Sequence, residues 1–252
     1  MDPTARFSKR AEDYARARPS YPAAVIEVLQ RECGLTPRAT VADIGCGTGL
    51  LAKLFCDFGN TVIGVEPNAD MREAAREYLA SYPKFTIVDG RAETTSLPER
   101  SVDFIAAGQS AHWFEARATQ SEFRRILRPD GWLALVWNDR RYGPAPFMVA
   151  YEELTQRFAR EYAHVKALWD HQRLGELFGS ENYRQASFEH LQRLDCEGLI
   201  RRILSASYMP GRDDAGFPSM MHAIRKLFEK YEQQGIVVVE YDTRVFYGRL
   251  QD

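Results

Sequence analysis

The sequence of 252 residues has few cysteines, no long apolar run and no excess of one charge. Its four cysteines (Cys33, Cys46, Cys56 and Cys196) form no C-x-x-C pair, which indicates free thiols in a reducing compartment and no metal site. The apolar runs are far shorter than the ~18 residues that a membrane span needs. No apolar segment typical of a signal peptide follows Met1. We therefore expect a soluble, cytoplasmic protein with no membrane partner.

The charges are nearly balanced, because 33 Lys and Arg residues stand against 35 Asp and Glu residues. A duplex-binding protein usually carries a basic stripe that displaces counterions from phosphates, and none is visible here. Nucleic acid is therefore not an expected partner. The hydrophobic share of 45% and the charged share of 27% are typical of a folded globular protein and exclude disorder over most of the chain.

Short apolar runs alternate with segments of helical spacing along the first half of the chain. The β-rich runs are Thr40–Ile44, Asn60–Val65, Phe85–Val88, Val102–Ala107 and Trp132–Trp137, and the helical segments are Leu50–Phe58, Asn68–Tyr82 and Ala116–Leu127. Continuous apolar strands separated by helices predict a parallel sheet covered on both faces, and right-handed crossovers make it a doubly wound α/β fold. Ligands of such sheets bind outside the carboxyl ends of the strands.

The length fits a single domain, which we divide into four parts. Residues 1–36 form an N-terminal arm and residues 37–138 a ligand-binding core. Residues 139–184 are a helical insertion rich in aromatic and charged residues. Residues 185–252 supply further helices and β-rich segments that complete the sheet.

A glycine-rich loop, Asp43–Gly49 (DIGCGTG), follows the first β-rich run and opens a helix. Glycines allow tight turns and close approach of the backbone to a ligand. The loop is not a dinucleotide fingerprint, because Leu50 stands where G-x-G-x-x-G requires its third glycine, and it is not a P-loop. It predicts a binding site for another nucleotide-like ligand.

Two further strand ends carry polar residues. Glu66 ends the second run, where a carboxylate can accept hydrogen bonds from both hydroxyls of a ribose, although a helix-capping role is the alternative. The stretch Asp89–Glu93 follows the third run and could meet the edge of an adenine, although Asp-Gly is also a common turn.

Five segments in this order resemble the motifs of class I S-adenosylmethionine-dependent methyltransferases: VADIGCGTG, VIGVEPNADM, DGRAE, VDFIAAGQSAHWF and LRPDGWLALVWN. The resemblance runs from about Ala39 to Asn138. The segments FSKRAEDYARARPSYP, AHWF and VVVEYDTRVFYGRL also resemble the subgroup of trans-aconitate methyltransferases and related small-molecule enzymes. The resemblance implies a Rossmann-like sheet of seven strands whose last strand is antiparallel, with an N-terminal arm and a helical lid insertion.

The resemblance also implies the cofactor, S-adenosyl-L-methionine, which leaves as S-adenosyl-L-homocysteine. On the family pattern Asp43 holds the amino group, Glu66 binds the ribose hydroxyls and Met71 packs on the adenine. The complete implied set is Tyr14, Arg18, Asp43, Gly45, Cys46, Gly47, Gly49, Glu66, Pro67, Met71, Ala92, Glu93 and Gln109. Arg18 has a second interpretation, as part of a solvated basic face.

The methyl acceptor is expected at the segment Gln109–Phe114, where Gln109, His112 and Trp113 are the candidate catalytic residues. Gln109 and the Trp113 N–H can donate hydrogen bonds, and His112 can act as a base or as a donor. A carboxylate acceptor needs no base near pH 7, whereas a phenol or an amine usually does. A capping role for His112 and a core role for Trp113 stay open. Ser110 does not complete the G-x-S-x-G nucleophile motif, because His112 occupies its last position.

The sequence therefore predicts a methyltransferase that uses S-adenosylmethionine and acts on a small molecule, with a carboxylic acid as candidate acceptor. Arg140 and Arg141, just after the fifth run, either contribute to the acceptor site or belong to a solvated face. Two other functions stay open: a nicotinamide-dependent oxidoreductase, and a non-catalytic cofactor-binding module on the same fold. The sequence does not fix the oligomeric state.

Overall fold

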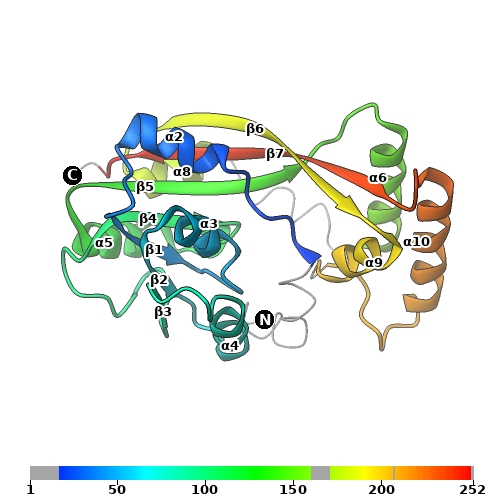
Figure 1. Ribbon diagram of the computed structural model, residues 1–252, viewed down its shortest axis with the longest axis horizontal. Coiled ribbons are helices and arrows are strands. Elements are labelled where there is room, and N and C mark those ends of the chain that lie inside the picture. Colours follow the sequence, from blue (N-terminus) through cyan, green and yellow to red (C-terminus); the bar gives the residue numbers. More distant parts are fainter. Residues whose placement is uncertain (1–16, 160–170, 207, 251–252) are drawn as a thin grey trace.

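A seven-stranded sheet forms the centre of the molecule, in the strand order β3-β2-β1-β4-β5-β7-β6 (Figure 1). The structure is a computed structural model that describes residues 17–159, 171–206 and 208–250. The expected contact of Tyr14 with the cofactor, like residues 1–16 of the N-terminal arm, lies outside these residues. The strands are β1 (Thr40–Ile44), β2 (Thr61–Val65), β3 (Phe85–Val88), β4 (Val102–Gly108), β5 (Leu127–Arg140), β6 (Arg184–Leu194) and β7 (Val237–Gly248).

Strands β1 to β5 are parallel, and β7 is antiparallel to both of its neighbours, β5 and β6. This confirms the prediction of a doubly wound sheet whose last strand is antiparallel. The Arg128–Gly131 segment lies within β5 as an irregularity, because Leu127 pairs with Val102 while Trp132 already pairs with Phe104. Asp130 takes a left-handed φ of 67° there.

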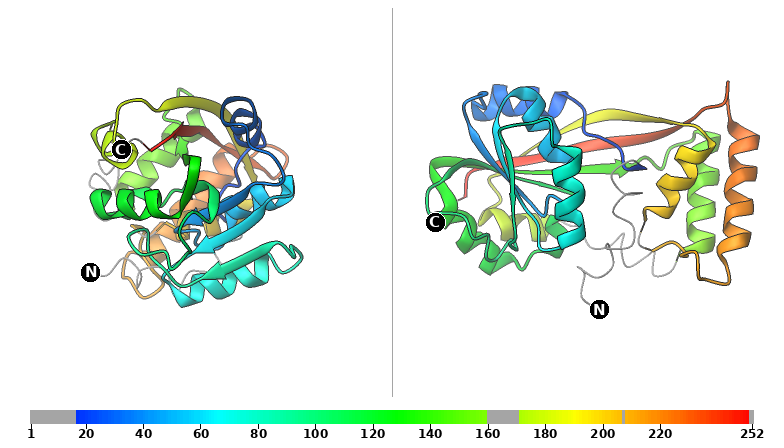
Figure 2. Two further views of the ribbon diagram at one scale, coloured as in Figure 1. Left: turned by 90° about the vertical axis from the view of Figure 1, so that its left-hand side faces the viewer. Right: turned by 60° about the horizontal axis from the view of Figure 1, so that its bottom comes forward.

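Helices cover both faces of the sheet (Figure 2). Helices α2 (Ala24–Cys33) and α3 (Leu50–Phe58) pack on one face, where Leu29 and Phe55 are fully buried. Helices α5 (Ala116–Ile126) and α8 (His171–Phe178) pack on the other. Helix α4 (Ala69–Tyr78) follows β2 and is shorter than the predicted Asn68–Tyr82 segment.

Three helices pack together beyond one end of the sheet: α6 (Pro146–Phe158), α9 (Cys196–Leu204) and α10 (Phe217–Tyr231) (Figure 1). The β6–β7 ribbon reaches them, because its pairing continues to Leu194 and Val237 after β5 has ended at Arg140. These helices and the ribbon end have a hydrophobic core of their own. We call them the outer lobe, and the rest of the sheet with α2 to α5 and α8 the sheet core.

Strand β6 is the one strand of the sheet that the sequence pattern does not locate. It lies at the sheet edge, and its side chains alternate between exposed and half-buried along almost its whole length. Polar His190 and Gln192 stand between the inward apolar residues Phe188 and Leu194, so the apolar alternation that marks a strand is interrupted. Its place in the sheet is set by pairing with β7.

The predicted helical insertion, 139–184, contains α6 and α8, and residues 160–170 between them lie outside the described part of the chain. Its proposed role as a lid is therefore untested. No helix in the described ranges is long and apolar enough to cross a membrane.

Candidate active site

A cavity with roughly 1140 Å³ of empty space, part of it open to solvent, lies at the carboxyl ends of β1, β2 and β4. Eleven of the predicted site residues line it: Asp43, Gly45, Cys46, Gly47, Glu66, Pro67, Met71, Ala92, Glu93, Gln109 and Trp113. Other lining residues lie within the predicted stretches Asp43–Gly49, Asp89–Glu93 and Gln109–Phe114, namely Thr48, Gly90, Arg91, Ser110 and Phe114. The sequence prediction did not include the lining residues Tyr21, Leu50, Leu51, Asn68 and Gly108. Most of these residues are neighbours of predicted residues in the sequence, and this proximity was the signal that could have identified them.

The glycines of the loop after β1 serve different purposes. Gly45 and Gly47 have left-handed φ values of 64° and 54°. A Cβ on Gly45 would stand 2.7 Å from the Cβ of Ser110, whereas nothing lies within 4 Å of the same position on Gly47. Gly47 therefore leaves its backbone open to a ligand in the cavity. Gly49 is not among the lining residues. It caps α3 with a φ of 85°, and a Cβ there would meet Leu79 at 2.7 Å, so its role is structural.

Asp43 places a fully buried carboxyl group at the cavity. Neither of its oxygens forms a hydrogen bond of normal geometry with the described residues, and the nearby Ala52 N–H offsets the cost of burial only in part. Burial, together with the nearby charge of Glu66, raises the pKa of Asp43 to about 7. Such a group is costly without a partner, and a cationic donor in the cavity would compensate it. The Thr48 hydroxyl is likewise buried and unpaired among the described residues.

Glu66 is 8% exposed, and local backbone groups fix its carboxylate. One oxygen accepts from the Gly47 N–H and the other from the Asn68 N–H, each at 3.0 Å. Asn68 is also the N-cap of α4, since its side chain accepts from the Met71 N–H at 3.0 Å. Burial raises the pKa of Glu66. Each oxygen retains a lone pair, so the carboxylate can accept two more hydrogen bonds from a diol.

Met71 and Ala92 are buried and give the cavity an apolar part. The Glu93 carboxylate accepts from the Glu115 N–H at 2.8 Å and thereby ties the loop after β3 to the start of α5. Its side chain is therefore engaged in the protein, although the residue lines the cavity.

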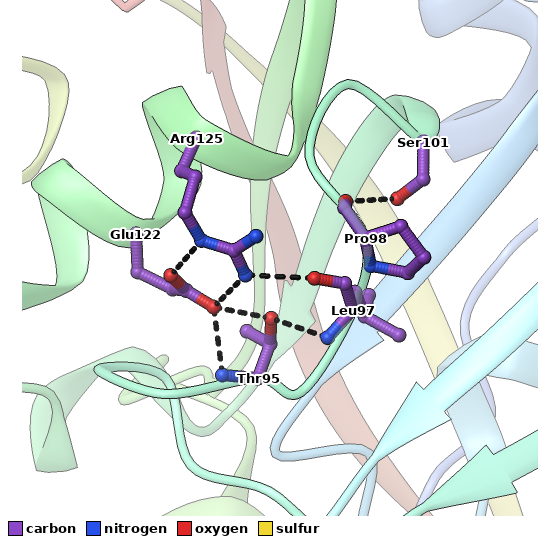
Figure 3. Close-up of polar contacts among 6 residues, drawn as sticks. All are labelled: Thr95, Leu97, Pro98, Ser101, Glu122 and Arg125. Carbon is purple, nitrogen blue, oxygen red and sulfur yellow. Dashed lines mark hydrogen bonds and ion pairs between the residues drawn. The ribbon is translucent and has the colours of Figure 1, made fainter.

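The same loop is fixed a second time further on, by Glu122 of α5 (Figure 3). The Glu122 carboxylate accepts from the Thr95 N–H at 2.8 Å and from the Thr95 hydroxyl at 2.6 Å. Arg125 pairs with Glu122 at 2.7 Å and donates to the Leu97 carbonyl at 2.7 Å. These contacts hold the segment that follows Ala92 against α5.

Gln109 lies where β4 ends, with a left-handed φ of 59°. Its backbone N–H donates to the Val136 carbonyl at 3.0 Å, and its side chain donates to the Asn138 carbonyl at 3.0 Å. Gly108, just before it, leaves room for Tyr21, whose hydroxyl would stand 2.6 Å from a Cβ there. The end of the N-terminal arm thus reaches the cavity through Tyr21.

His112 and Trp113 lie on a short 3₁₀ helix, η3 (Ala111–Trp113), with their ring centres 4.7 Å apart. Trp113 lines the cavity and is 41% exposed, so it is not an ordinary core residue. His112 is not among the lining residues. Burial, with the charge of Arg173, lowers the pKa of His112 to about 4, so the imidazole is neutral at pH 7. Arg173 donates to the carbonyls of His112 and Phe114, at 3.1 and 2.7 Å.

Ser110 donates its hydroxyl hydrogen to the Ile44 carbonyl at 2.7 Å and is buried. That bond fixes η3 to the end of β1, which agrees with the absence of a complete nucleophile motif.

The structure does not bring Arg18 to the cavity. Its guanidinium donates to the Ser205 carbonyl at 2.9 Å, just after α9, and nearby the Gln192 amide donates to the Ala17 carbonyl at 2.9 Å. Arg18 thus attaches the arm to the outer lobe.

Arg140 and Arg141 likewise do not line the cavity. Arg140 pairs with Glu152 of α6 at 2.7 Å, and Arg141 pairs with Asp242 of β7 at 2.7 Å. Both arginines therefore connect elements around the end of β5.

The structure is a doubly wound α/β fold with its cavity at the strand ends. The sheet, whose last strand is antiparallel, carries a glycine loop after β1 and a buried carboxylate held by backbone N–H groups after β2. A family model described as "Methyltransferase domain" matches residues 42–135. The part of the chain from β1 to β5 is therefore similar to methyltransferase domains.

Relatives of the chain extend this comparison. An uncharacterized methyltransferase of Mycobacterium tuberculosis is 36% identical over 141 residues, which cover 55% of this chain and 54% of the relative. A methyltransferase-like protein of Schizosaccharomyces pombe is 24% identical over 245 residues, covering 95% and 93% of the two chains. A solved structure from Anaeromyxobacter dehalogenans, provisionally described as a type II methyltransferase, has a TM-score of 0.66 at 22% identity. It covers 92% of this chain and 98% of its own.

The chain spans about half the length of the first curated relatives that it matches.

Proposed function

We propose that this protein transfers the methyl group of S-adenosylmethionine to a small-molecule acceptor in the cavity at the ends of β1, β2 and β4. The observation that carries the proposal is the buried, only partly compensated carboxyl of Asp43 beside the fixed carboxylate of Glu66. This pair supports a ligand with an ammonium group and a ribose diol.

The lining residues fit the parts of that cofactor. Asp43 would hold the ammonium group, Glu66 the ribose hydroxyls, and Met71 and Ala92 the adenine. The open side of Gly47 would allow close approach of the ligand to the backbone. When bound, the cofactor supplies a methyl group already activated on a sulfonium. The acidic residues of the cavity favour a ligand with this positive charge.

The acceptor side supports a group that is already ionised. Because the donor is activated, the chain has mainly to hold the acceptor close and in line, with Gln109 and the Trp113 N–H as candidate donors. His112, with a pKa of about 4, is a weak base at pH 7. O-methylation of a carboxylic acid, which needs no base, is therefore the reaction we propose. The four cysteines are free, which supports a reducing, cytoplasmic compartment.

Titration calorimetry of the full chain with S-adenosylhomocysteine and with reduced nicotinamide cofactor tests this function. We expect heat only with S-adenosylhomocysteine. Transfer of labelled methyl to a panel of carboxylic acids, phenols and amines should then favour the acids. Binding of the nicotinamide cofactor alone would indicate an oxidoreductase. Binding of S-adenosylhomocysteine without transfer to any class would indicate a non-catalytic module.

A further inference from the structure

Strand β6 forms one edge of the sheet and is long for an edge strand. It has 11 residues, about twice the usual length of a strand, and it pairs with β7 on one side. The strand at the opposite edge, β3, has four residues. In Figure 1 β6 runs along one border of the sheet as far as α9. The outer side of an edge strand presents a row of backbone N–H and C=O groups that can pair with a strand of another molecule.

Several features that commonly protect an edge strand are missing from β6. Proteins block such edges with proline, with a β-bulge, or with a covering helix or loop. The sequence of β6 contains no proline, and its register with β7 runs without a shift over all 11 residue pairs. In the described part of the chain, no other segment forms backbone hydrogen bonds with the outer side of β6. The bond from Gln192 to the Ala17 carbonyl comes from an inward-facing side chain and leaves the strand edge open.

The exposed face of β6 has side chains at every second position: Gln185, Ser187, Glu189, Leu191 and Arg193. Leu191 is 53% exposed and is one of the large apolar side chains that the fold leaves uncovered. Glu189 and Arg193 flank it with opposite charges, each two positions away. Glu189 pairs with Arg141 of its own chain at 2.8 Å, yet its side chain remains 76% exposed. A leucine between opposite charges therefore lies along an open edge.

A second copy of the chain fits this edge in one particular register. When two β6 strands pair antiparallel about a two-fold axis at Leu191, each Leu191 faces the partner's Leu191. Glu189 then lies opposite the partner's Arg193, and this pair occurs twice because of the symmetry. Side chains directly opposite one another have Cβ atoms about 4.5–5.5 Å apart, where opposite charges stabilise the pairing. The paired segment runs from Phe188 to Leu194.

Neighbouring registers of the same pairing are less favourable. A two-fold axis at Glu189 or at Arg193 sets two like charges directly opposite each other, which is destabilising. An axis at His190 or at Gln192 sets Leu191 opposite a charged side chain. Leu191 is therefore the centre that both the apolar and the charged side chains favour.

We propose that β6 is the interface through which two copies of this chain form a two-fold symmetric dimer with one continuous sheet. Addition of a strand to an open edge supplies main-chain hydrogen bonds, and the side chains determine the register. The interface goes beyond the proposed function and does not depend on it, because the cavity lies at the ends of β1, β2 and β4.

Sedimentation of the full chain over a concentration series that reaches about 1 mM tests for this dimer. We expect reversible self-association. Arg193→Glu should weaken it about 10-fold, because the variant sets two carboxylates opposite each other at two places. Adding Glu189→Arg to that variant restores opposite charges and should strengthen the association again. Gln185→Glu, on the same face of β6 but outside the paired segment, should leave it unchanged.

Thiol cross-linking tests the register. Leu191→Cys places two thiols at the two-fold axis, and a short thiol cross-linker should join the two chains. Ser187→Cys places them about 27 Å apart along the strands, so this variant should not be joined. Both variants are made with Cys196→Ser, because Cys196 is half-buried whereas the other three cysteines are buried.

A monomer at every concentration would overturn the inference. An association that Arg193→Glu leaves unchanged would also overturn it, as would a double variant that associates no more tightly than Arg193→Glu alone. Cross-linking of Ser187→Cys rather than Leu191→Cys would place the interface elsewhere and would have the same consequence. The substituted side chains are exposed, so the variants should melt as the wild type does. If Arg193→Glu does not fold, the two cysteine variants decide the question.

Discussion

The sheet core and the outer lobe are stabilised by different kinds of interior. The sheet core buries apolar runs on both faces of parallel strands, and its polar residues gather at the strand ends. The outer lobe buries amphipathic helices around a long antiparallel ribbon and has the Arg202 and Tyr241 side chains within it. The comparison teaches that one chain contains two separately packed interiors, and that the cavity belongs to the sheet core.

Asp43→Asn, in the sheet core, should have the largest effect of the substitutions considered. It should alter how the unfolding free energy of the cofactor-free protein depends on pH. The raised pKa of Asp43 means that the folded state holds a proton that the unfolded state has released between about pH 4 and pH 7. Stability should therefore fall as pH rises through this window, by up to about 4 kcal/mol, and the Asn variant should lose this dependence.

Chemical unfolding at several pH values measures this effect, with Asp70→Asn on the exposed first turn of α4 as the matched control. A wild-type protein whose stability is flat between pH 4 and pH 7 would contradict the assignment.

Ile224→Ala tests whether the outer lobe is separate in function. Ile224 of α10 is fully buried in the core of that lobe. Its truncation should cost about 2–4 kcal/mol of unfolding free energy, through lost burial and the cavity left behind. The affinity for S-adenosylhomocysteine, measured by calorimetry well below the melting temperature, should stay unchanged. A parallel loss of affinity would show that the two regions are coupled in cofactor binding.

Glu66→Ala should weaken S-adenosylhomocysteine binding by about 1–3 kcal/mol, because the variant leaves buried partners unpaired. The affected partners in the protein are the Gly47 and Asn68 N–H groups, besides the ribose hydroxyls of the ligand. Calorimetry measures the change, and Glu73→Ala on the exposed face of α4 is the control. Wild-type affinity in the Glu66 variant would mean that the diol is bound elsewhere.

Glu122→Gln should have the smallest effect, about 1 kcal/mol, on unfolding free energy near pH 7. The Arg125 guanidinium, with Thr95, lowers the pKa of Glu122 to about 2, below its ordinary value of 4.5. The contribution of Glu122 is therefore present above about pH 4.5 and is lost as pH falls toward 2. The unfolding free energies of wild type and variant should therefore converge as pH falls. A difference in unfolding free energy that grows at low pH would contradict this prediction.

The sequence pattern located some helices and strands more accurately than others. Strands β1 and β3 and helix α3 agree with prediction to the residue, because apolar runs and a glycine loop mark their ends. β5 extends beyond the predicted Trp132–Trp137 at both ends, since pairing with β7 continues to Arg140. β6 was not located, because polar His190 and Gln192 interrupt its inward apolar positions.

The candidate site shows the same division. The positions of Asp43 and Glu66 followed from strand ends and spacing, and both line the cavity. Arg18 and His112 could not be placed this way. The guanidinium of Arg18 donates to a carbonyl of the outer lobe, and His112 is buried outside the cavity lining, with its backbone carbonyl bonded to Arg173.

The sequence by itself determined the parallel part of the sheet, the glycine loop and the carboxylate after β2. These features depend on apolar periodicity and on backbone conformations that a few residue types allow, and both are local properties. Only the tertiary structure decided which charges are buried and which are paired. Arg18, Arg140 and Arg202 look alike in sequence, yet one anchors the arm, one pairs with Glu152 and one is buried against Tyr241. The role of a charged side chain depends on the groups that surround it, and the folded chain determines which groups these are.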